Sequence, residues 1–235
     1  MLLRKKLDRL YDAGLRNISI GLYGTGDDYD TYVQRKGMFK CLEDGLAYAR
    51  SRYGNELKLD FGWVLMRPTC SVEAIRSMWR LVERYEMPVS VSLIHYSLPY
   101  FTEGPDRVLQ FTPDDRDAID AAVAELMRLK ESRPELLPQS WVSLKSIPDW
   151  LLKGPNMAVP CDRYRLIWVG ADGTVQMCYV TFKLGNLHEK RLKDMLFTPE
   201  HHDAARNGFK LNCPNCHCAY PTRIQTHLPS LIRYS

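Results

Sequence analysis

Cysteine is the residue type best suited to binding a metal in this 235-residue sequence, and its positions are uneven. Cys41 and Cys70 stand alone, whereas the other five of the seven cysteines fall in the last third of the chain. These five are Cys161, Cys178, Cys213, Cys216 and Cys218. In a reducing compartment, clustered cysteines bind metals more often than they form disulfides. We therefore expect a metal site in the last third of the chain.

The spacing of four of these cysteines predicts that they meet. Cys161 precedes and Cys178 closes a pair of short strands joined by an Asp-Gly turn, and a tight hairpin of this kind brings its two ends together. Cys213 and Cys216 form a CxxC turn, from which two thiolates can bind one metal centre. Four thiolates suit tetrahedral zinc and an iron–sulfur cluster equally well. Cys218 is an alternative ligand.

Composition excludes several classes of protein. Apolar residues make up 45% and charged residues 26% of the chain, which is typical of a folded globular protein and not of a disordered or collagen-like one. The net charge of +4 is too small and too dispersed to indicate nucleic-acid binding. No apolar run reaches the ~18 to 20 residues that cross a bilayer, and no export signal opens the sequence. We expect a cytoplasmic protein without nucleic-acid or membrane partners.

The elements that precede the cysteines predict an α/β fold. Apolar residues recur at helical spacing near the N-terminus, over 37–53 and 71–86, and in a long helix that begins at Thr112-Pro113. Between them, strands are expected at 16–23, 57–66 and 89–97, each with one apolar face and one face of small or polar residues. Alternating strands and helices imply a parallel sheet. We expect this sheet to curve into a partial (half) parallel β/α barrel whose polar face can hold a ligand, and the alternative is an open sheet with one solvated face.

The pattern changes after residue 153. We assign residues 1–153 to the partial barrel with its connecting helices and residues 154–235 to a small α+β cysteine-rich domain, divided at the Gly-Pro-Asn that follows Lys153. A helical piece over 141–152, broken by Pro148, closes the first part. The second part predicts a hairpin of strands 164–169 and 174–179, a helix in one or two pieces over 192–207, and little regular structure after Cys218.

Three motifs follow one another in the last third. They are Cys161-x11-Gly173-x4-Cys178, then Leu184-Gly185-Asn186-Leu187-His188-Glu189, then Cys213-x2-Cys216. Together they resemble the auxiliary-cluster region called SPASM, in its shortened twitch form, of radical S-adenosylmethionine (SAM) proteins. The resemblance implies that these four cysteines hold one auxiliary 4Fe–4S cluster. Cys218 does not fit the pattern for a second cluster.

The resemblance extends to the N-terminal half. Residues 13–24 are similar to the fourth strand of the radical SAM partial barrel and its approach, and the next two strands match the fifth and sixth. A polar residue on the fourth strand, often serine, approaches the ribose of SAM in this family. Ser19 is of this type, and Gly21 is the other residue that can align there.

The motif that holds the SAM-cleaving cluster, CxxxCxxC, is absent from this sequence, as are the first three barrel strands. We therefore expect the chain to be the C-terminal part or a separate subunit of a radical SAM enzyme, with an N-terminal portion as its partner. The resemblance implies hydrogen-abstraction chemistry on a peptide or small molecule, no SAM cleavage by this chain alone, and no catalytic residue in it. The alternative is a non-enzymatic domain that is stapled by zinc and binds a partner.

Overall fold

The computed structural model describes residues 2–96, 106, 108–161, 166–178 and 181–235, with side chains from residue 6 onward. The chain forms two compact units. The first comprises residues 1–94 and 107–140, and the second comprises residues 95–106 and 141–235. The division predicted at residues 153 and 154 concerns the start of the cysteine-rich domain and stays a prediction.

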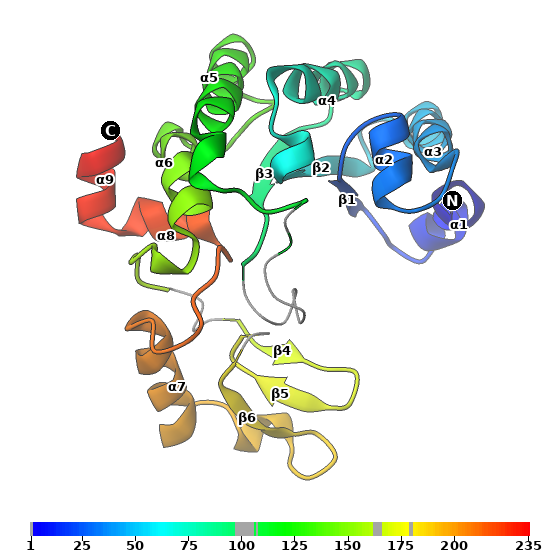
Figure 1. The fold of residues 1–235 in the computed structure, drawn as a ribbon. Coiled ribbons are helices and arrows are strands. Elements are labelled where there is room, and N and C mark those ends of the chain that lie inside the picture. The colour runs from blue at the N-terminus through cyan, green and yellow to red at the C-terminus, as the bar shows by residue number, and fades with distance from the viewer. Residues whose placement is uncertain (1, 97–105, 107, 162–165, 179–180) are drawn as a thin grey trace. The chain divides into compact units, whose positions relative to one another are not determined.

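The first unit is built from alternating helices and strands (Figure 1). In chain order they are α1 (Leu2–Asp12), β1 (Asn17–Leu22), α2 (Asp27–Tyr32), α3 (Met38–Tyr53), β2 (Lys58–Leu65), the 3-10 turn η1 (Arg67–Thr69), α4 (Val72–Tyr85), β3 (Val89–Leu93), the 3-10 turn η2 (Pro113–Asp115) and α5 (Arg116–Ser132). The predicted helices and the three predicted strands are found, but the strand expected at 89–97 ends at Leu93, and residue 97 lies outside the described residues. Helix α2 lies in a stretch for which no element was predicted. It is only six residues long and buries none of them, so it has no apolar pattern to read.

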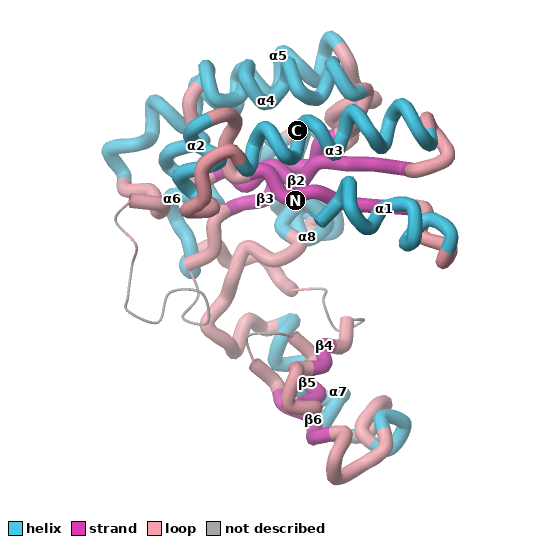
Figure 2. Tube along the Cα trace, turned by 90° about the vertical axis from the view of Figure 1, so that its right-hand side faces the viewer, coloured by secondary structure: helices cyan, strands magenta, loops and turns pink. Residues whose placement is uncertain are grey.

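The sheet of the first unit is parallel, in the order β1-β2-β3. Along β2, Leu59, Phe61, Trp63 and Leu65 are all buried, whereas the residues between them are partly exposed. This confirms the predicted alternation. Figure 2 shows α3, α4 and α5 on one side of the sheet, where the apolar face forms the core. The fold class is therefore α/β, a parallel sheet covered by helices, as predicted.

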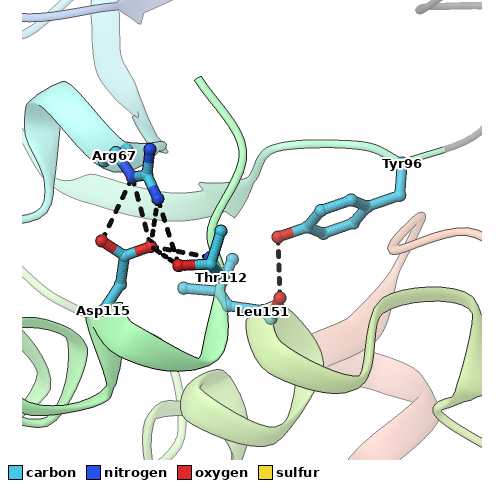
Figure 3. A network of polar contacts seen from close by, with 5 residues as sticks. All are labelled: Arg67, Tyr96, Thr112, Asp115 and Leu151. Carbon is cyan, nitrogen blue, oxygen red and sulfur yellow. Dashed lines mark hydrogen bonds and ion pairs between the residues drawn. The ribbon is translucent and has the colours of Figure 1, made fainter. Parts of the chain in front are cut away.

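An ion pair joins Arg67, in the turn after β2, to Asp115, in the turn before α5. Figure 3 shows the guanidinium of Arg67 directed at the carboxylate of Asp115, with Nη2 at 2.6 Å from Oδ2. The same oxygen accepts the backbone N–H of Thr112 at 2.7 Å. Hydrogen bonds from Arg67, the largest cause, and from Thr112 lower the pKa of Asp115. The predicted start of the long helix is confirmed, with a 3-10 turn inserted before it.

Glu125 on α5 pairs with Arg76 on α4, which joins the two helices, and with Arg128 on α5 itself. It accepts hydrogen bonds from Arg128 Nη2 at 2.7 Å and from Arg76 Nε at 2.8 Å, and its side chain is 7% exposed. The hydrogen bonds from Arg128, followed by those from Arg76, lower the pKa of Glu125 from 4.5 to about 2. Both arginines are more than half exposed, so water screens much of this attraction.

We expect Glu125→Gln to lower the free energy of unfolding by about 1–2 kcal/mol at pH 7. Because the folded state depresses the pKa, the stabilisation is present above pH 4.5 and is lost as the pH falls towards 2. The difference in free energy of unfolding between wild type and Glu125→Gln, measured by urea unfolding, should therefore fall to near zero over this pH interval. Asp120→Asn removes an exposed pair on the same helix and should cost less than ~0.5 kcal/mol. If the free energies of unfolding of wild type and Glu125→Gln differ by the same amount at pH 7 and near pH 2, the ionised carboxylate of Glu125 is not the source of the stabilisation.

The second unit contains helices and a separate antiparallel sheet. Its elements are α6 (Trp141–Lys153), the 3-10 turn η3 (Gly154–Asn156), β4 (Trp168–Val169), β5 (Thr174–Gln176), β6 (Lys183–Asn186), the 3-10 turn η5 (Leu192–Asp194), α7 (Pro199–Phe209), α8 (Tyr220–Thr226) and α9 (Leu228–Tyr234). The predicted hairpin is confirmed as β4 and β5, although residues 164 and 165 of its first strand and residue 179 of its second lie outside the described residues. The helix predicted over 192–207 does fall into two pieces, and Thr198 caps the second.

Two expectations for the second unit were wrong. Helix α6 continues through Pro148, because its buried apolar face holds it together despite the missing backbone N–H. The residues after Cys218 form α8 and α9, which pack against each other and against α6. Tyr96 also joins this group, donating its hydroxyl to the carbonyl of Leu151 at 2.7 Å (Figure 3). In the part of the chain that is described, no helix has the length and apolarity needed to cross a membrane.

Candidate metal centre

One pocket in the second unit collects every cysteine of the last third. Its wall includes Cys161, Cys178, Cys213, Cys216 and Cys218. The pocket has about 510 Å³ of space, open solvent at its mouth included. All seven cysteines of the chain lie among the described residues, and all are free thiols. Five thiols that line one pocket supply the soft ligands that a thiolate-bound group requires.

The remaining two cysteines lie elsewhere, in the first unit. Cys41 is on α3, and Cys70 is buried after η1. Burial raises the pKa of the Cys70 thiol to about 12, with a smaller contribution from Asp115, so this thiol stays protonated at neutral pH. Neither residue belongs to the pocket, in agreement with the sequence analysis.

Cys178 reaches the pocket from the turn that follows β5. The β4–β5 hairpin turns at Gly173, whose backbone φ of +77° favours glycine. A side chain there would also meet Asn186 Oδ1 at 2.9 Å. Asn186 in turn donates its side-chain amide to the carbonyl of Asp172 at 3.0 Å, which fastens β6 to the hairpin turn. The glycine and asparagine of the two motifs therefore set the shape of the sheet that presents Cys178.

Cys213 and Cys216 reach the pocket from a turn between α7 and α8. Asn215, 8% exposed, holds this turn to the chain that leads to Cys161. Its Nδ2 donates to the carbonyl oxygens of Pro155 at 2.8 Å and Met157 at 3.0 Å. Its Oδ1 accepts the backbone N–H of Cys216 at 2.9 Å. Two of the predicted ligand segments are thus connected by one side chain.

Arg223 makes a second connection between the same segments. This residue on α8 is 1% exposed and lies in the wall of the cysteine pocket. Its guanidinium donates to carbonyl oxygens on both sides: Val159 and Pro160 before Cys161, and Cys216 in the CxxC turn. Sequence analysis missed both Arg223 and Asn215. The asparagine inside CPNC carries a weak turn signal, and the arginine carries none.

The thiols surround a space and do not converge on a point. Among the described residues, no three His, Cys, Asp or Glu side chains lie close enough together to hold a single metal ion. His217, between Cys216 and Cys218, is 3% exposed and packs its ring against those of Trp150 and Tyr96, with centroids 5.6 Å and 5.1 Å away. Aromatic packing around His217 therefore helps to hold the loop that carries the last three thiols.

Ser19 and Gly21 lie in the first unit, on the exposed face of β1. Ser19 donates its hydroxyl to Asp60 Oδ2 on the paired strand at 2.6 Å. Gly21 is in register with Gly62 and, through it, with Ser90. Nothing lies within 4 Å of the position that a Cβ would take at Gly62, whereas at Gly21 that position is 2.9 Å from the hydroxyl oxygen of Tyr23, whose ring covers this glycine.

The cysteine segment has a recognisable sequence family. Residues 161–218 match the SPASM family of iron-sulfur cluster-binding domains. The SPASM match begins and ends at cysteines that line the pocket. It confirms the resemblance that the spacing of the cysteines indicated. No curated protein matches the chain in sequence.

Solved structures extend the likeness beyond the SPASM segment. Native anSMEcpe with bound AdoMet, an anaerobic sulfatase-maturating enzyme of the radical SAM/SPASM type, is similar with a TM-score of 0.57 and 13% identity, over 86% of this chain and 55% of that one. The same enzyme with AdoMet and Cp18Cys peptide gives 0.56 and 13%, over 83% and 54%. At this identity the likeness shows the fold. The chain spans about half the length of these structures.

Proposed function

We propose that Cys161, Cys178, Cys213 and Cys216 hold one 4Fe–4S cluster, with Cys218 as an alternative ligand. The observation that carries this proposal is the gathering of all five thiols on one pocket inside the SPASM segment. Iron–sulfur clusters in proteins are held by cysteine thiolates in sets of four. The cluster-binding domain in this proposal spans residues 154–235.

The residues around the thiols fit such a group. Met177, Phe182 and Leu211 contribute apolar side chains to the same wall. Asn215 and Arg223 fix the two segments that present Cys161 and Cys216. Burial and hydrogen bonds near the sulfurs are the means by which proteins tune such a site. When bound, an auxiliary cluster supplies an electron-transfer centre or a binding point for substrate.

The first unit contributes the SAM side in this proposal. Residues 1–153 form the C-terminal part of a partial barrel, and the exposed face of β1 at Ser19 and Gly21 lies towards S-adenosylmethionine. The hydroxyl of Ser19 and the carboxylate of Asp60, 2.6 Å apart, offer hydrogen-bonding groups to a polar ligand such as a ribose. Ligands of open parallel α/β sheets bind outside the carboxyl ends of the strands.

The whole enzyme, in this proposal, carries out radical hydrogen abstraction on a peptide or small molecule. An N-terminal radical SAM portion, in the same longer chain or in a separate subunit, supplies the CxxxCxxC cysteines. Support comes from the fold shared with the anSMEcpe structures, which were solved with AdoMet and, in two cases, with a peptide. The polar sheet face and the cysteine pocket are the two sites of this chain that such a reaction would use.

Anaerobic reconstitution of the full chain with iron and sulfide tests the proposal. We expect a brown protein with about four iron and four sulfide per chain and a broad visible absorption. A colourless protein that retains one zinc would instead support the zinc-stapled alternative. Addition of SAM and dithionite to the reconstituted chain should give no 5′-deoxyadenosine, because this sequence contains no CxxxCxxC. Formation of 5′-deoxyadenosine would contradict the proposal that SAM cleavage needs an N-terminal portion outside this sequence.

A further inference from the structure

Arg223 carries a positive charge into the interior beside the thiol pocket. It is 1% exposed, and a guanidinium is protonated at every accessible pH. Its carbon Cζ lies 4.8 Å from the centroid of the Trp150 ring, within the range of a cation–π contact. Burying a charge is costly unless polar groups or opposite charges surround it. The position of Arg223 thus indicates a function that needs a cation there.

The hydrogen bonds of Arg223 connect segments that are far apart in the sequence. Nε donates to Pro160 at 3.2 Å and Nη2 donates to Val159, both directly before Cys161. Nη1 donates to the carbonyl of Cys216 at 2.7 Å, and Nη2 also donates to Asn215 Oδ1 at 3.2 Å. One rigid, planar group therefore sets the spacing between the Cys161 arm and the CxxC turn. A lysine could supply the charge but could not make these bonds at once.

Thiolate ligation makes the pocket negative. Four thiolates on a cluster core with two positive charges give a net charge of about −2, and reduction adds one more negative charge. A cation in the pocket wall lowers the energy of the more negative form, with little screening because the guanidinium is buried. The charge of Arg223 is therefore complementary to the group that the cysteines are proposed to hold.

We infer that Arg223 is a positioning and charge-compensating residue for the cysteine site, and that it raises the reduction potential of the bound group. The inference rests on the proposed function for its electrostatic part. Its positional part, the fixed spacing of the Cys161 arm and the CxxC turn, holds for the metal-free chain as well. Arg223 lies outside the segment matched by the SPASM family, which ends at residue 218.

The variants Arg223→Gln and Arg223→Lys separate the two roles. In the reconstituted full chain, both should lose iron to a chelator about 10–100-fold faster than wild type, since both break the planar set of hydrogen bonds. Arg223→Gln should also shift the midpoint potential to a more negative value. Redox titration of the visible absorption measures this shift. Arg223→Lys should retain a potential close to wild type. Arg206→Gln, on an arginine whose side chain is 69% exposed, is the control and should change neither.

Hydrogen exchange of the metal-free chain tests the positional part separately. Both Arg223 variants should exchange the amide of Cys216 faster than wild type, because that amide is bonded to Asn215. Folded variants with wild-type potential, chelator resistance and exchange would overturn the inference. If the wild type binds no iron, the proposed function fails, and unchanged exchange at Cys216 would then overturn the positional part as well.

Discussion

Serine in place of Cys178 is expected to remove the bound cluster, leaving less than about a tenth of the wild-type iron and sulfide. A serine hydroxyl has nearly the size of the thiol but stays protonated and is a hard ligand, so it cannot replace a soft thiolate. Cys178 is the best position for this experiment because it enters the pocket alone, from the turn after β5. Cys216, in contrast, has Cys218 two residues away to take its place. Iron and sulfide analysis with visible absorption measures the outcome.

Two matched variants make this result specific. Cys41→Ser changes a partly exposed thiol on α3 in the first unit and should keep the full metal content. Cys218→Ser should also keep it if Cys216 is the ligand, whereas the double variant of Cys216 and Cys218 should not. A Cys178→Ser protein with unchanged iron, sulfide and absorption would show that the ligand set is wrong. If the wild type contains zinc and Cys178→Ser loses it, the proposed ligands are correct, but the group that they bind is zinc and not an iron–sulfur cluster.

Local signals account for most of what could be predicted from the sequence. The alternation of Phe61 and Trp63 with smaller residues indicated a strand with one buried face, because side chains of a strand point to opposite sides in turn. The Asp172-Gly173 turn indicated the hairpin, because few other dipeptides adopt its backbone geometry. The helical spacing over 71–86 indicated α4, and Ser71 caps it by accepting the backbone N–H of Ala74 at 3.1 Å. Each of these signals lies within a few residues of the structure it determines.

The missed features depend on contacts between distant residues. Helices α8 and α9 are seven residues each, shorter than the window in which a helical period can be recognised. Their stability comes from packing on α6, which is more than 60 residues away in sequence. Arg223 bonds to Val159 across 64 positions, and side-chain bonds to backbone carbonyls leave no pattern of residue types. The cysteine ligands could be predicted from the chain, but not the residues that hold them in place.

Asn215→Ala is expected to lower the free energy of unfolding of the metal-free chain by about 2–4 kcal/mol. The side chain uses all of its hydrogen-bonding capacity: two donated bonds to Pro155 and Met157, and two accepted bonds from Cys216 and Arg223. Removing it leaves these buried groups without their partner. The backbone φ of +55° adds a strain of about 1 kcal/mol for alanine, which asparagine tolerates better. Urea unfolding measures the loss.

Asn215→Gly separates the two causes, because glycine loses the same hydrogen bonds but adopts the left-handed backbone without strain. It should be more stable than Asn215→Ala by up to about 1 kcal/mol and still less stable than wild type. Asn212→Ala is the matched control, since Asn212 is exposed and bonds only to Asn207 among the contacts found for it, so its cost should stay below ~0.5 kcal/mol. If Asn215→Ala costs no more than Asn212→Ala, neither the hydrogen bonds nor the backbone conformation of Asn215 holds the turn, which then depends on Arg223 and the aromatic packing of His217. A large cost for both alanine and glycine would instead show that the hydrogen bonds of this one side chain hold the CxxC turn against the arm of Cys161.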